Sequence, residues 1–536
     1  MRKNSIYNNA LIMLLLACLC VFAIMGLKHL EIEFLEATNG DEFPQILQFE
    51  KMFYGALNLN IKQFFAFEFY NYGFVYYVLN LLVTAPFFAF DNYAGAIYMP
   101  RILNGIFSIV NIIMLYKIAK LYLSAKNAFL LMLVFISMAG FYLGGLNIKP
   151  DFFQSFFVLL CVYFLILDNV SFGKYYKLAV CALGLGIGIA KFQAIMFLPL
   201  IYSYICLPCV YSFSKANILK ASKNIAISTM AMFALWIATN PYLLHPRGFN
   251  AWLNMFILNM NSNATNHGSY VNPTLNDKIF NVIDFYYFEI LVFVVLLVLC
   301  FYIVARFLRE RDKRFGVFAS IVCGFIISLL YLLLFVNKTW ASYYISTICL
   351  GVVILGFGGG QIMNKRLPLF FGVILLLQIG GGFLNGAYRD VFMKEKNIDS
   401  IKQRSEIMVS QLKQVAPKDK IYNVLTNNTA FAFLELNLKP KNIFNVYGKL
   451  DKQGFVYEEW AKKPHTFAFV PKDFIVLFKD SAFFKPPKHI DSNLATSIEV
   501  LNELENGSLP FRKVFDSSDL VIFQNTDSAH SLILGE

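Results

Sequence analysis

Residues 71–90 read NYGFVYYVLNLLVTAPFFAF, and whether this stretch crosses the membrane decides the orientation of every later helix. It is long and apolar enough to cross a membrane, since roughly 20 apolar residues span a ~30 Å hydrocarbon core. However, it opens with Asn71 and Gly73, carries Asn80, and is broken near its end by Pro86. Its tyrosines suit a membrane interface, where an amphipathic ring keeps one end in water. The charges of the other loops indicate whether it crosses.

Further apolar runs of similar length make up most of the chain before residue 387. They cover residues 8–27, 97–122, 127–147, 152–168, 176–190, 192–211, 224–240, 284–305, 315–336, 341–361 and 367–386. Of the 536 residues, 58% are hydrophobic and 15% are charged, whereas soluble domains have about 45–50% and about 25%. The chain is therefore predicted to be an all-α polytopic membrane protein. The first run lacks a clear small-x-small cleavage site, so we expect a retained anchor.

The cations in the loops and helix ends after residue 110 fall into two unequal groups. One group holds Lys117, Lys120, Lys126, Lys174, Lys177, Lys215, Lys220, Lys223, Arg306, Arg309, Arg311, Lys313, Arg314, Lys365 and Arg366. The alternate loops hold only Lys149, Lys191, Arg247, Lys278 and Lys338. Because cytoplasmic loops carry the excess of Lys and Arg, the larger group and the basic N-terminus both belong in the cytoplasm.

Both conditions hold only if residues 71–90 do not cross but lie in the outer interface. The sequence then predicts about eleven transmembrane helices plus interfacial helices. Residues 1–386 form the membrane domain, and residues 387–536 lie on the non-cytoplasmic side. Short β-rich runs between charged and Pro/Gly-marked breaks predict a small soluble α/β domain in this tail.

The charge and the cysteines argue against a nucleic-acid-binding protein and against a disulfide-rich domain. The net charge of +12 comes from loop cations that set orientation, so we expect no nucleic acid partner. All nine cysteines fall inside apolar runs, which indicates packing and gives no disulfide framework: Cys18, Cys20, Cys161, Cys181, Cys206, Cys209, Cys300, Cys323 and Cys349.

Carboxylates stand at two places on the predicted outer face. Asp41 and Glu42 lie in the first external loop, and Asp151 follows Lys149 and Pro150 at a later turn. Charge near hydrocarbon is costly and tends to mark function, which favours carboxylates at the mouth of a membrane cavity. The alternative is that each aspartate caps a helix, because each stands close to a proline at a predicted helix start.

Cations stand on the same face. Arg101 opens one apolar run, and Lys191 follows a glycine-rich stretch between two others. Either side chain could bind a phosphate or extend to the lipid headgroups. The loop 241–283 carries Arg247 and His267 around a partly apolar helix, and we expect it to form a lid over the site. The alternative for His267 is a solvated loop side chain.

Together these residues place two carboxylates and two to four cations at one depth. This suits a substrate with an anionic head in the interface and an apolar tail in lipid, which is the form of a polyprenyl-phosphate sugar. The competing class is a transporter or flippase of a lipid-linked or small anionic substrate. Transporters usually place charges near the bilayer midplane, whereas here the polar groups gather at one surface, which favours an interfacial enzyme.

The order of these features resembles the GT-C superfamily of glycosyltransferases that use a lipid-phosphate sugar. These include the dolichyl-phosphate-mannose protein mannosyltransferases and the bacterial lipid A aminoarabinose transferase. The resemblance covers about residues 8–270. Its motifs here are Asp41-Glu42, the stretch Tyr72-Gly73-Phe74-Val75-Tyr76-Tyr77, Arg101, Lys149-Pro150-Asp151, the glycine-rich helix ending at Lys191, Asn240-Pro241-Tyr242 and His267-Gly268.

Three family features are missing. Tyr72-Gly73 stands where the lipid A subgroup has a Lys-Pro pair, which argues against the aminoarabinose function. The Trp-Trp-Asp signature of oligosaccharyltransferases is absent, and so is an Asp-x-Asp metal motif in the first loop. No cofactor is expected, and the sequence leaves dependence on a metal open.

The resemblance implies a GT-C-like hexosyl- or pentosyltransferase of the bacterial inner membrane that acts in cell-surface glycan or lipopolysaccharide synthesis. Its partners would be membrane lipid, a polyprenyl-phosphate sugar donor and an extracytoplasmic acceptor, which is a glycolipid, a polysaccharide or a protein. We expect one inverting displacement, with Asp41 as the base and Asp151 positioning it or the acceptor. Substrate-binding roles are expected for Glu42, Tyr72, Tyr76, Arg101, Lys149, Lys191, Arg247 and His267.

Overall fold

The computed structural model describes residues 2–30, 42–65, 72–265 and 273–393. Beyond these it describes residues 407, 410–412, 414, 424–426, 443–445, 450–451, 454–455, 474–478, 505–507, 511–517 and 520–525. Two predicted site residues, Asp41 and His267, lie outside the described residues. The chain divides into two compact units: Met1–Leu30 with Gln45–Ala264 and Pro273–Lys394, and Glu31–Pro44 with Thr265–Asn272 and Glu395–Glu536.

The first unit is built from helices. Those before Lys191 are α1 (Arg2–Gly26), α3 (Phe43–Leu57), α4 (Ile61–Phe65), α5 (Phe74–Phe88), α6 (Tyr93–Ala119), α7 (Ala125–Ile136), α8 (Ala139–Leu146), α9 (Asp151–Asp168), α10 (Lys174–Leu185) and the π-helix η1 (Gly186–Ala190). Those after it are η2 (Phe192–Phe197), α11 (Leu198–Tyr211), α12 (Lys215–Thr239), η3 (Pro241–Leu244), α13 (Pro246–Thr265), α14 (Leu275–Lys278), η5 (Ile279–Tyr287), α15 (Ile290–Glu310), α16 (Lys313–Leu334), η6 (Ala341–Tyr344), α17 (Ile345–Met363), η7 (Asn364–Arg366), α18 (Leu367–Leu384) and α19 (Ala387–Phe392).

Eight helical segments in the described residues are long and apolar enough to cross a membrane, or nine if the bent pair α7–α8 counts as one span. The predicted number was about eleven, and two features of the helices explain the difference. The segment Ala341–Leu384 contains both α17 and α18, which a short 3-10 turn joins. In addition, α10 has only 12 residues before it continues as a π-helix, so it is too short to meet the length criterion alone.

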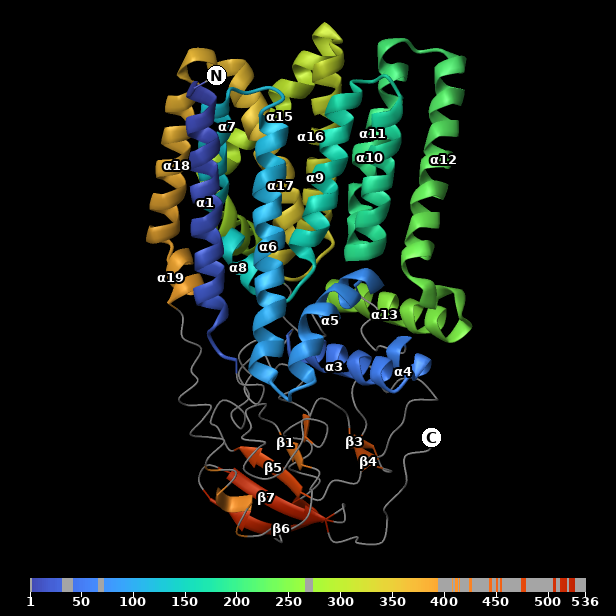
Figure 1. The fold of residues 1–536 in the computed structure, drawn as a ribbon, viewed down its shortest axis with the longest axis vertical. Helices are drawn as coiled ribbons and strands as arrows, with labels where there is room; N and C mark the ends of the chain where they lie inside the picture. Colours follow the sequence, from blue (N-terminus) through green and yellow to red (C-terminus); the bar gives the residue numbers. More distant parts are fainter. Residues whose placement is uncertain are drawn as a thin grey trace. The chain divides into compact units, whose positions relative to one another are not determined.

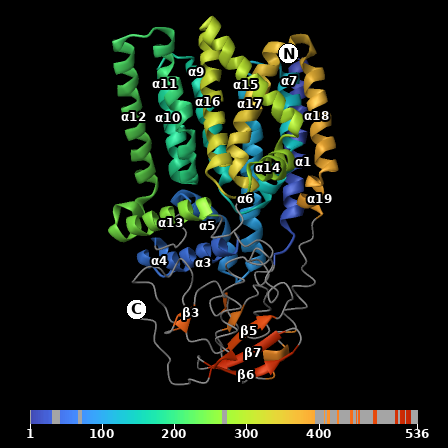
Figure 2. The same ribbon diagram turned by 180° about the vertical axis from the view of Figure 1, so that it is seen from behind.

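The stretch predicted to lie in the interface forms α5, a helix of 15 residues. At 1.5 Å per residue it is about 22 Å long, which is less than the ~30 Å of a hydrocarbon core. It lies at one end of the bundle, where α3, α4 and α13 run across the direction of the long helices (Figure 1, Figure 2). Aromatic contacts join α3 to α5, with ring centroids 6.0 Å apart for Phe49 and Tyr77 and 5.9 Å for Phe53 and Phe88.

Helix α13 is held against the bundle by a second aromatic cluster. The Trp252 ring lies 5.2 Å from the Phe192 ring and 4.8 Å from the Trp236 ring, measured between centroids. Phe192 directly follows Lys191, so this cluster fixes α13 beside the turn that carries the lysine. Residues Phe249, Leu253, Ile257 and Met260 of α13 stay exposed. The partly apolar helix predicted in the loop 241–283 is therefore present, as α13.

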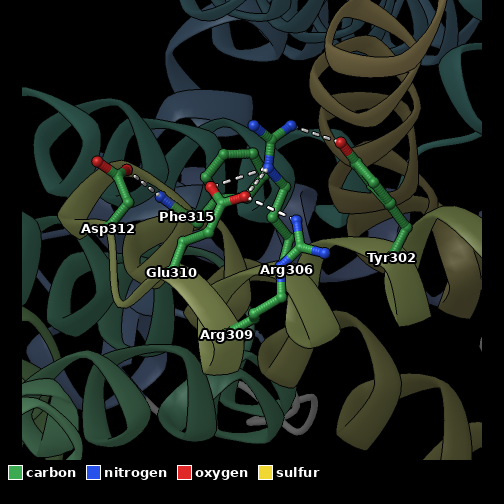
Figure 3. Close-up of polar contacts among 6 residues, drawn as sticks. All are labelled: Tyr302, Arg306, Arg309, Glu310, Asp312 and Phe315. Carbon is green, nitrogen blue, oxygen red and sulfur yellow. Dashed lines mark hydrogen bonds and ion pairs between the residues drawn. The ribbon is translucent and has the colours of Figure 1, made fainter.

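The opposite end of the bundle carries the turn between α15 and α16 (Figure 1), and Figure 3 shows its polar contacts. Arg306 donates from Nε to the Glu310 carboxylate at 3.0 Å and from Nη1 to the Tyr302 hydroxyl at 2.6 Å. The Asp312 carboxylate accepts from the Phe315 backbone N–H and so caps the start of α16. The Arg306 and Glu310 side chains are 31% and 33% exposed, so this pair contributes little to stability.

The second unit contains short strands: β1 (Val424–Thr426), β2 (Ile443–Asn445), β3 (Leu450–Asp451), β4 (Gly454–Phe455), β5 (Phe474–Phe478), β6 (Phe511–Asp516) and β7 (Leu520–Asn525). Five of them form a mixed sheet in the order β2-β1-β5-β7-β6, and β3 pairs with β4. Strand β1 runs parallel to β2 and β5, whereas β7 runs antiparallel to β5 and β6. The predicted fold class, a polytopic all-α membrane protein with a small C-terminal α/β domain, is confirmed.

Candidate functional site

A buried ion pair lies at the end of the bundle that carries α5 and α13. The Lys191 Nζ atom is 3.0 Å from Asp151 Oδ1, and the two side chains are 11% and 5% exposed. Asp151 is the first residue of α9, where the helix dipole favours a negative charge. Pro150 occupies the cap position, and Asp151 makes no side-chain capping bond. The capping alternative for Asp151 is therefore excluded.

The second carboxylate oxygen of Asp151 is available for another donor. Asp151 Oδ2 is buried and has no hydrogen-bond partner among the described residues. A buried acceptor without a donor is costly, so such an atom indicates a place for water or a ligand hydroxyl. Because Lys191 satisfies Oδ1, the ionised carboxylate can accept a further hydrogen bond while its charge stays compensated.

The break in the helix places Lys191 beside α5. The π-helix η1 ends at Ala190, and Lys191 takes an extended conformation with φ −149° and ψ 127°. Extended backbone lets it pair with Tyr72 as an isolated antiparallel bridge, and the Gly73 N–H donates to the Ala190 carbonyl at 2.9 Å. The glycine-rich stretch that the sequence showed before Lys191 is thus the place where two chain segments meet.

Gly73 is required at this junction because a side chain there has no room. A Cβ on Gly73 would lie 2.2 Å from the Gly188 carbonyl oxygen and 2.4 Å from the Ile189 carbonyl carbon, both backbone atoms. We expect Gly73→Ala to lower the free energy of unfolding by about 1–3 kcal/mol and to displace Lys191. Thermal unfolding in detergent checks this, with Gly372→Ala as the control because nothing lies within 4 Å of its Cβ position. A stability of Gly73→Ala equal to that of the control would contradict it.

Asn240 joins three segments of the site and was not among the predicted site residues. Its Oδ1 accepts from the Phe74 N–H at 2.9 Å, which holds the start of α5. Its Nδ2 donates to the carbonyls of Gly188 and Trp236, each at 2.8 Å. In the sequence, only its place in the Asn240-Pro241-Tyr242 motif points to Asn240 as a site residue.

Aromatic rings enclose the ammonium group of Lys191. Its Nζ lies 5.8 Å from the Tyr72 ring centroid and 4.4 Å from that of Tyr343. Tyr343 was not predicted, whereas Tyr72 and Tyr76 were predicted to bind substrate. The structure places Tyr76 in the core with Phe153, fully buried. Burial also raises the pKa of the neighbouring Tyr77 well above its usual range, so this phenol stays protonated.

The other predicted residues that the structure describes have different settings. Lys149 has its Nζ 5.2 Å from the Trp340 ring centroid. Arg101 is buried and donates to the backbone carbonyls of Gly26 and Lys28 at 3.1 and 2.5 Å, at the end of α1. Arg247 is exposed in the first turn of α13, and Glu42 directly precedes α3.

The structure therefore brings together Asp151, Lys191 and Tyr72, while Arg101 holds the end of α1. Among the residues that the structure describes, no group of three or more His, Cys, Asp or Glu side chains could hold a metal ion.

Comparisons with known proteins show what the chain is similar to. The family model of dolichyl-phosphate-mannose-protein mannosyltransferase matches residues 80–240, which is less than half of the chain. The apo structure of ArnT from Cupriavidus metallidurans has a TM-score of 0.51 at 9% identity, covering 89% of this chain and 92% of that one. The same enzyme bound to undecaprenyl phosphate has a TM-score of 0.49 at 11% identity, covering 97% and 98%.

A more distant likeness joins the chain to an oligosaccharyltransferase of Archaeoglobus fulgidus in complex with Zn and sulfate. Its TM-score is 0.43 at 12% identity, covering 86% of this chain and 68% of that one. The sequence matches no curated relative. The match over residues 80–240 and the shared fold confirm the predicted resemblance, so this chain is a multi-pass membrane protein with a fold similar to that of the apo ArnT structure.

Proposed function

We propose that the protein is a glycosyltransferase that moves a sugar from a polyprenyl-phosphate donor to an extracytoplasmic acceptor. The observation that carries the proposal is the buried Asp151–Lys191 pair beside α5. Ionisable side chains within a membrane protein are expensive and mark function by default. A buried ion pair is weak evidence for stability alone, because desolvation offsets much of its attraction. A catalytic reason for keeping it is therefore favoured.

The chemistry follows from the charges. The bond between sugar C1 and the phosphate oxygen breaks, and the polyprenyl phosphate leaves with its electron pair. The acceptor oxygen forms a new bond to C1 from the opposite face, which inverts the configuration. Its proton passes to the base, for which we propose Asp41, while Asp151 Oδ2 orients the acceptor or the base. Lys191, Lys149 and Arg101 would stabilise the charge that develops on the leaving phosphate.

We propose substrate-binding roles for the other residues that the sequence singles out. Glu42, Tyr72, Arg247 and His267 would contact donor or acceptor, and Tyr76, which is buried in the core, would support Tyr72 from behind. The acceptor is a glycolipid, a surface polysaccharide or a protein, and residues 387–536 form an extracytoplasmic domain. Isolated membranes incubated with a radiolabelled polyprenyl-phosphate sugar test the activity. Label transferred to membrane or protein acceptors supports it, whereas transbilayer movement of intact donor without transfer supports the flippase alternative.

Topology gives a separate prediction, because all the site residues must face one compartment. We expect single cysteines at positions 149 and 451 to react with a membrane-impermeant maleimide from outside. A cysteine at position 313, at the start of α16, should react only after the membrane is opened. The native cysteines are in helical segments of the bundle, so a wild-type sample sets the background. Labelling of position 149 from the cytoplasmic side would refute both the orientation and the site.

A further inference from the structure

We propose that Gln154 binds a second hydroxyl group of the acceptor, beside the one that Asp151 Oδ2 orients, and that the acceptor is therefore a glycan. This inference rests on the proposed function, because it assigns a chemical class to the acceptor of the same reaction. Gln154 was not among the predicted site residues. It stands three residues after Asp151 on α9, so the two side chains lie on one face of the helix, with Cβ atoms about 5–6 Å apart.

A chain of hydrogen bonds fixes which way the Gln154 amide points. The Ser155 hydroxyl donates its single proton to the Asp151 carbonyl at 2.8 Å, so it accepts from the Ser346 hydroxyl, which lies 2.8 Å away. Ser346 has then used its own proton and accepts from Gln154 Nε2 at 3.3 Å. A hydroxyl has one proton to donate and an amide oxygen has none, so Oε1 cannot take the place of Nε2. The nitrogen therefore takes the side of Ser346, and Oε1 takes the other side of the amide.

Two oxygen atoms on this face of α9 have no donor. Gln154 Oε1 and Asp151 Oδ2 are both buried, and neither has a hydrogen-bond partner in the part of the chain that the structure describes. The two residues are 3% and 4% exposed, so bulk water does not compensate for the missing partners. A buried acceptor without a donor is costly. Because both atoms are acceptors, the missing groups are donors, which two hydroxyl groups or one fixed water molecule would supply.

Two hydroxyl groups suit this place better than a peptide does. A serine or threonine acceptor brings one hydroxyl, so its second donor would be a backbone N–H, and that group is accompanied by a carbonyl oxygen. An asparagine acceptor likewise carries a carbonyl beside its amide nitrogen. The hydroxyls beside Gln154, on Ser155 and Ser346, already donate within the chain, so neither can satisfy such a carbonyl. A sugar ring carries hydroxyls on adjacent carbons and need not bring a carbonyl.

The two oxygens stand beside the charges of the proposed reaction. Asp151 opens α9, and Lys191 Nζ lies 3.0 Å from its Oδ1. A hydroxyl held at Oδ2 is therefore close to the cation that is proposed to stabilise the leaving phosphate. One hydrogen bond would let the acceptor ring rotate, whereas a second bond at Gln154 fixes its orientation. Correct orientation of the attacking oxygen lowers the entropic part of the barrier, which gives Gln154 a function in the reaction.

Three variants separate the Gln154 oxygen from its packing. Gln154→Met removes the amide but keeps a side chain of similar length and volume, so the packing of α9 should persist. In Gln154→Glu the protonated acid would donate to Ser346 and accept from the ligand as the amide does. Asn127→Leu is the matched control, because Asn127 Oδ1 is also a buried atom with no partner among the described residues. Asn127 stands in the first turn of α7, a helix that holds none of the proposed site residues.

The test measures binding of the methyl α-pyranosides of mannose, glucose and galactose to the full-length protein in lipid nanodiscs, by saturation-transfer difference NMR. We expect at least one glycoside to bind, with a Kd that rises about 10-fold in Gln154→Met because one hydrogen bond is lost. Gln154→Glu should keep part of the affinity, and Asn127→Leu should bind as the wild type does. Among the monodeoxy forms of that glycoside, the one that lacks the hydroxyl bound by Gln154 should bind the wild type and Gln154→Met equally. A blocked tripeptide with a central serine should not compete.

Three outcomes would overturn the inference. The first is that no glycoside binds, or that one binds Gln154→Met as tightly as the wild type, as expected if only a fixed water occupies the place. The second is an equal loss for every monodeoxy form, which would mean that Gln154 acts through the fold. The third is competition by the serine peptide. A failure of the proposed function looks different: the wild type would transfer no sugar, yet glycoside binding would still depend on Gln154.

Discussion

Asp41→Asn is expected to abolish sugar transfer while the protein still inserts into the membrane at the wild-type level. The acceptor hydroxyl must lose its proton as the new bond to C1 forms, and an amide cannot take that proton. A positioned base contributes about 10²–10⁴-fold to such a step, so the rate should fall by at least that factor. The measurement is transfer of radiolabel from a polyprenyl-phosphate sugar in isolated membranes, normalised to the amount of protein.

The control for this substitution is a carboxylate with a purely structural role. Asp277 accepts hydrogen bonds from the Thr274 N–H and hydroxyl at 2.7 and 2.8 Å, which forms a capping box at the start of α14. In Asp277→Asn the amide oxygen can still accept, so we expect transfer close to that of the wild type. Activity of Asp41→Asn equal to that of Asp277→Asn would remove Asp41 from the mechanism.

The parts of the site that could be predicted from the sequence are those marked by local chemistry. The short helix α5 was predicted because its polar start, Pro86 and the loop charges all argued against crossing. The turn between two helices at Lys191 was predicted because a lysine interrupted an apolar stretch. In both cases a few neighbouring residues interrupt the apolar pattern of a membrane span. The interruption can be recognised from these residues alone, without knowledge of long-range contacts.

The other residues depend on contacts between segments far apart in the chain. Asn240 is 52 residues from Gly188, and its bonds to Gly188 and Phe74 give no pattern within any window of sequence. Lys338 counted only as one of five cations on the outer face, because nothing near it indicates that it shares the Trp340 ring with Lys149. The π-helix before Lys191 was not predicted either, since its glycines also fit ordinary close packing of helices.

For Arg101 the structure shows contacts that neither of its two predicted roles includes. A lone arginine at the outer start of a span could bind phosphate or reach toward lipid headgroups. In the structure its guanidinium donates to the Gly26 and Lys28 carbonyls. Carbonyls at a helix end lack intrahelical donors and carry partial negative charge, so they suit a cation. Phosphate binding by Arg101 remains a prediction.

Breaking the Asp151–Lys191 pair should destabilise the protein far more than breaking an exposed pair of the same length. Asp151→Asn leaves the Lys191 ammonium buried without its carboxylate, which costs about 3–5 kcal/mol for a buried pair. Lys191→Met leaves the carboxylate uncompensated and should cost a similar amount. Glu310→Gln breaks the Arg306–Glu310 pair, which is also 3.0 Å long but about one-third exposed, and should cost far less because solvent screens the pair.

The double variant Asp151→Asn with Lys191→Met separates stability from function. It leaves neither charge buried alone, so its melting temperature should lie above those of both single variants. The two changes in unfolding free energy would then be non-additive, as expected for residues in contact. Sugar transfer should stay lost in all three variants, because the Asp151 carboxylate and the Lys191 cation are proposed to act on the substrates. A double variant with restored stability and restored transfer would mean that the pair only supports the fold, and additive losses would mean that the two charges do not interact.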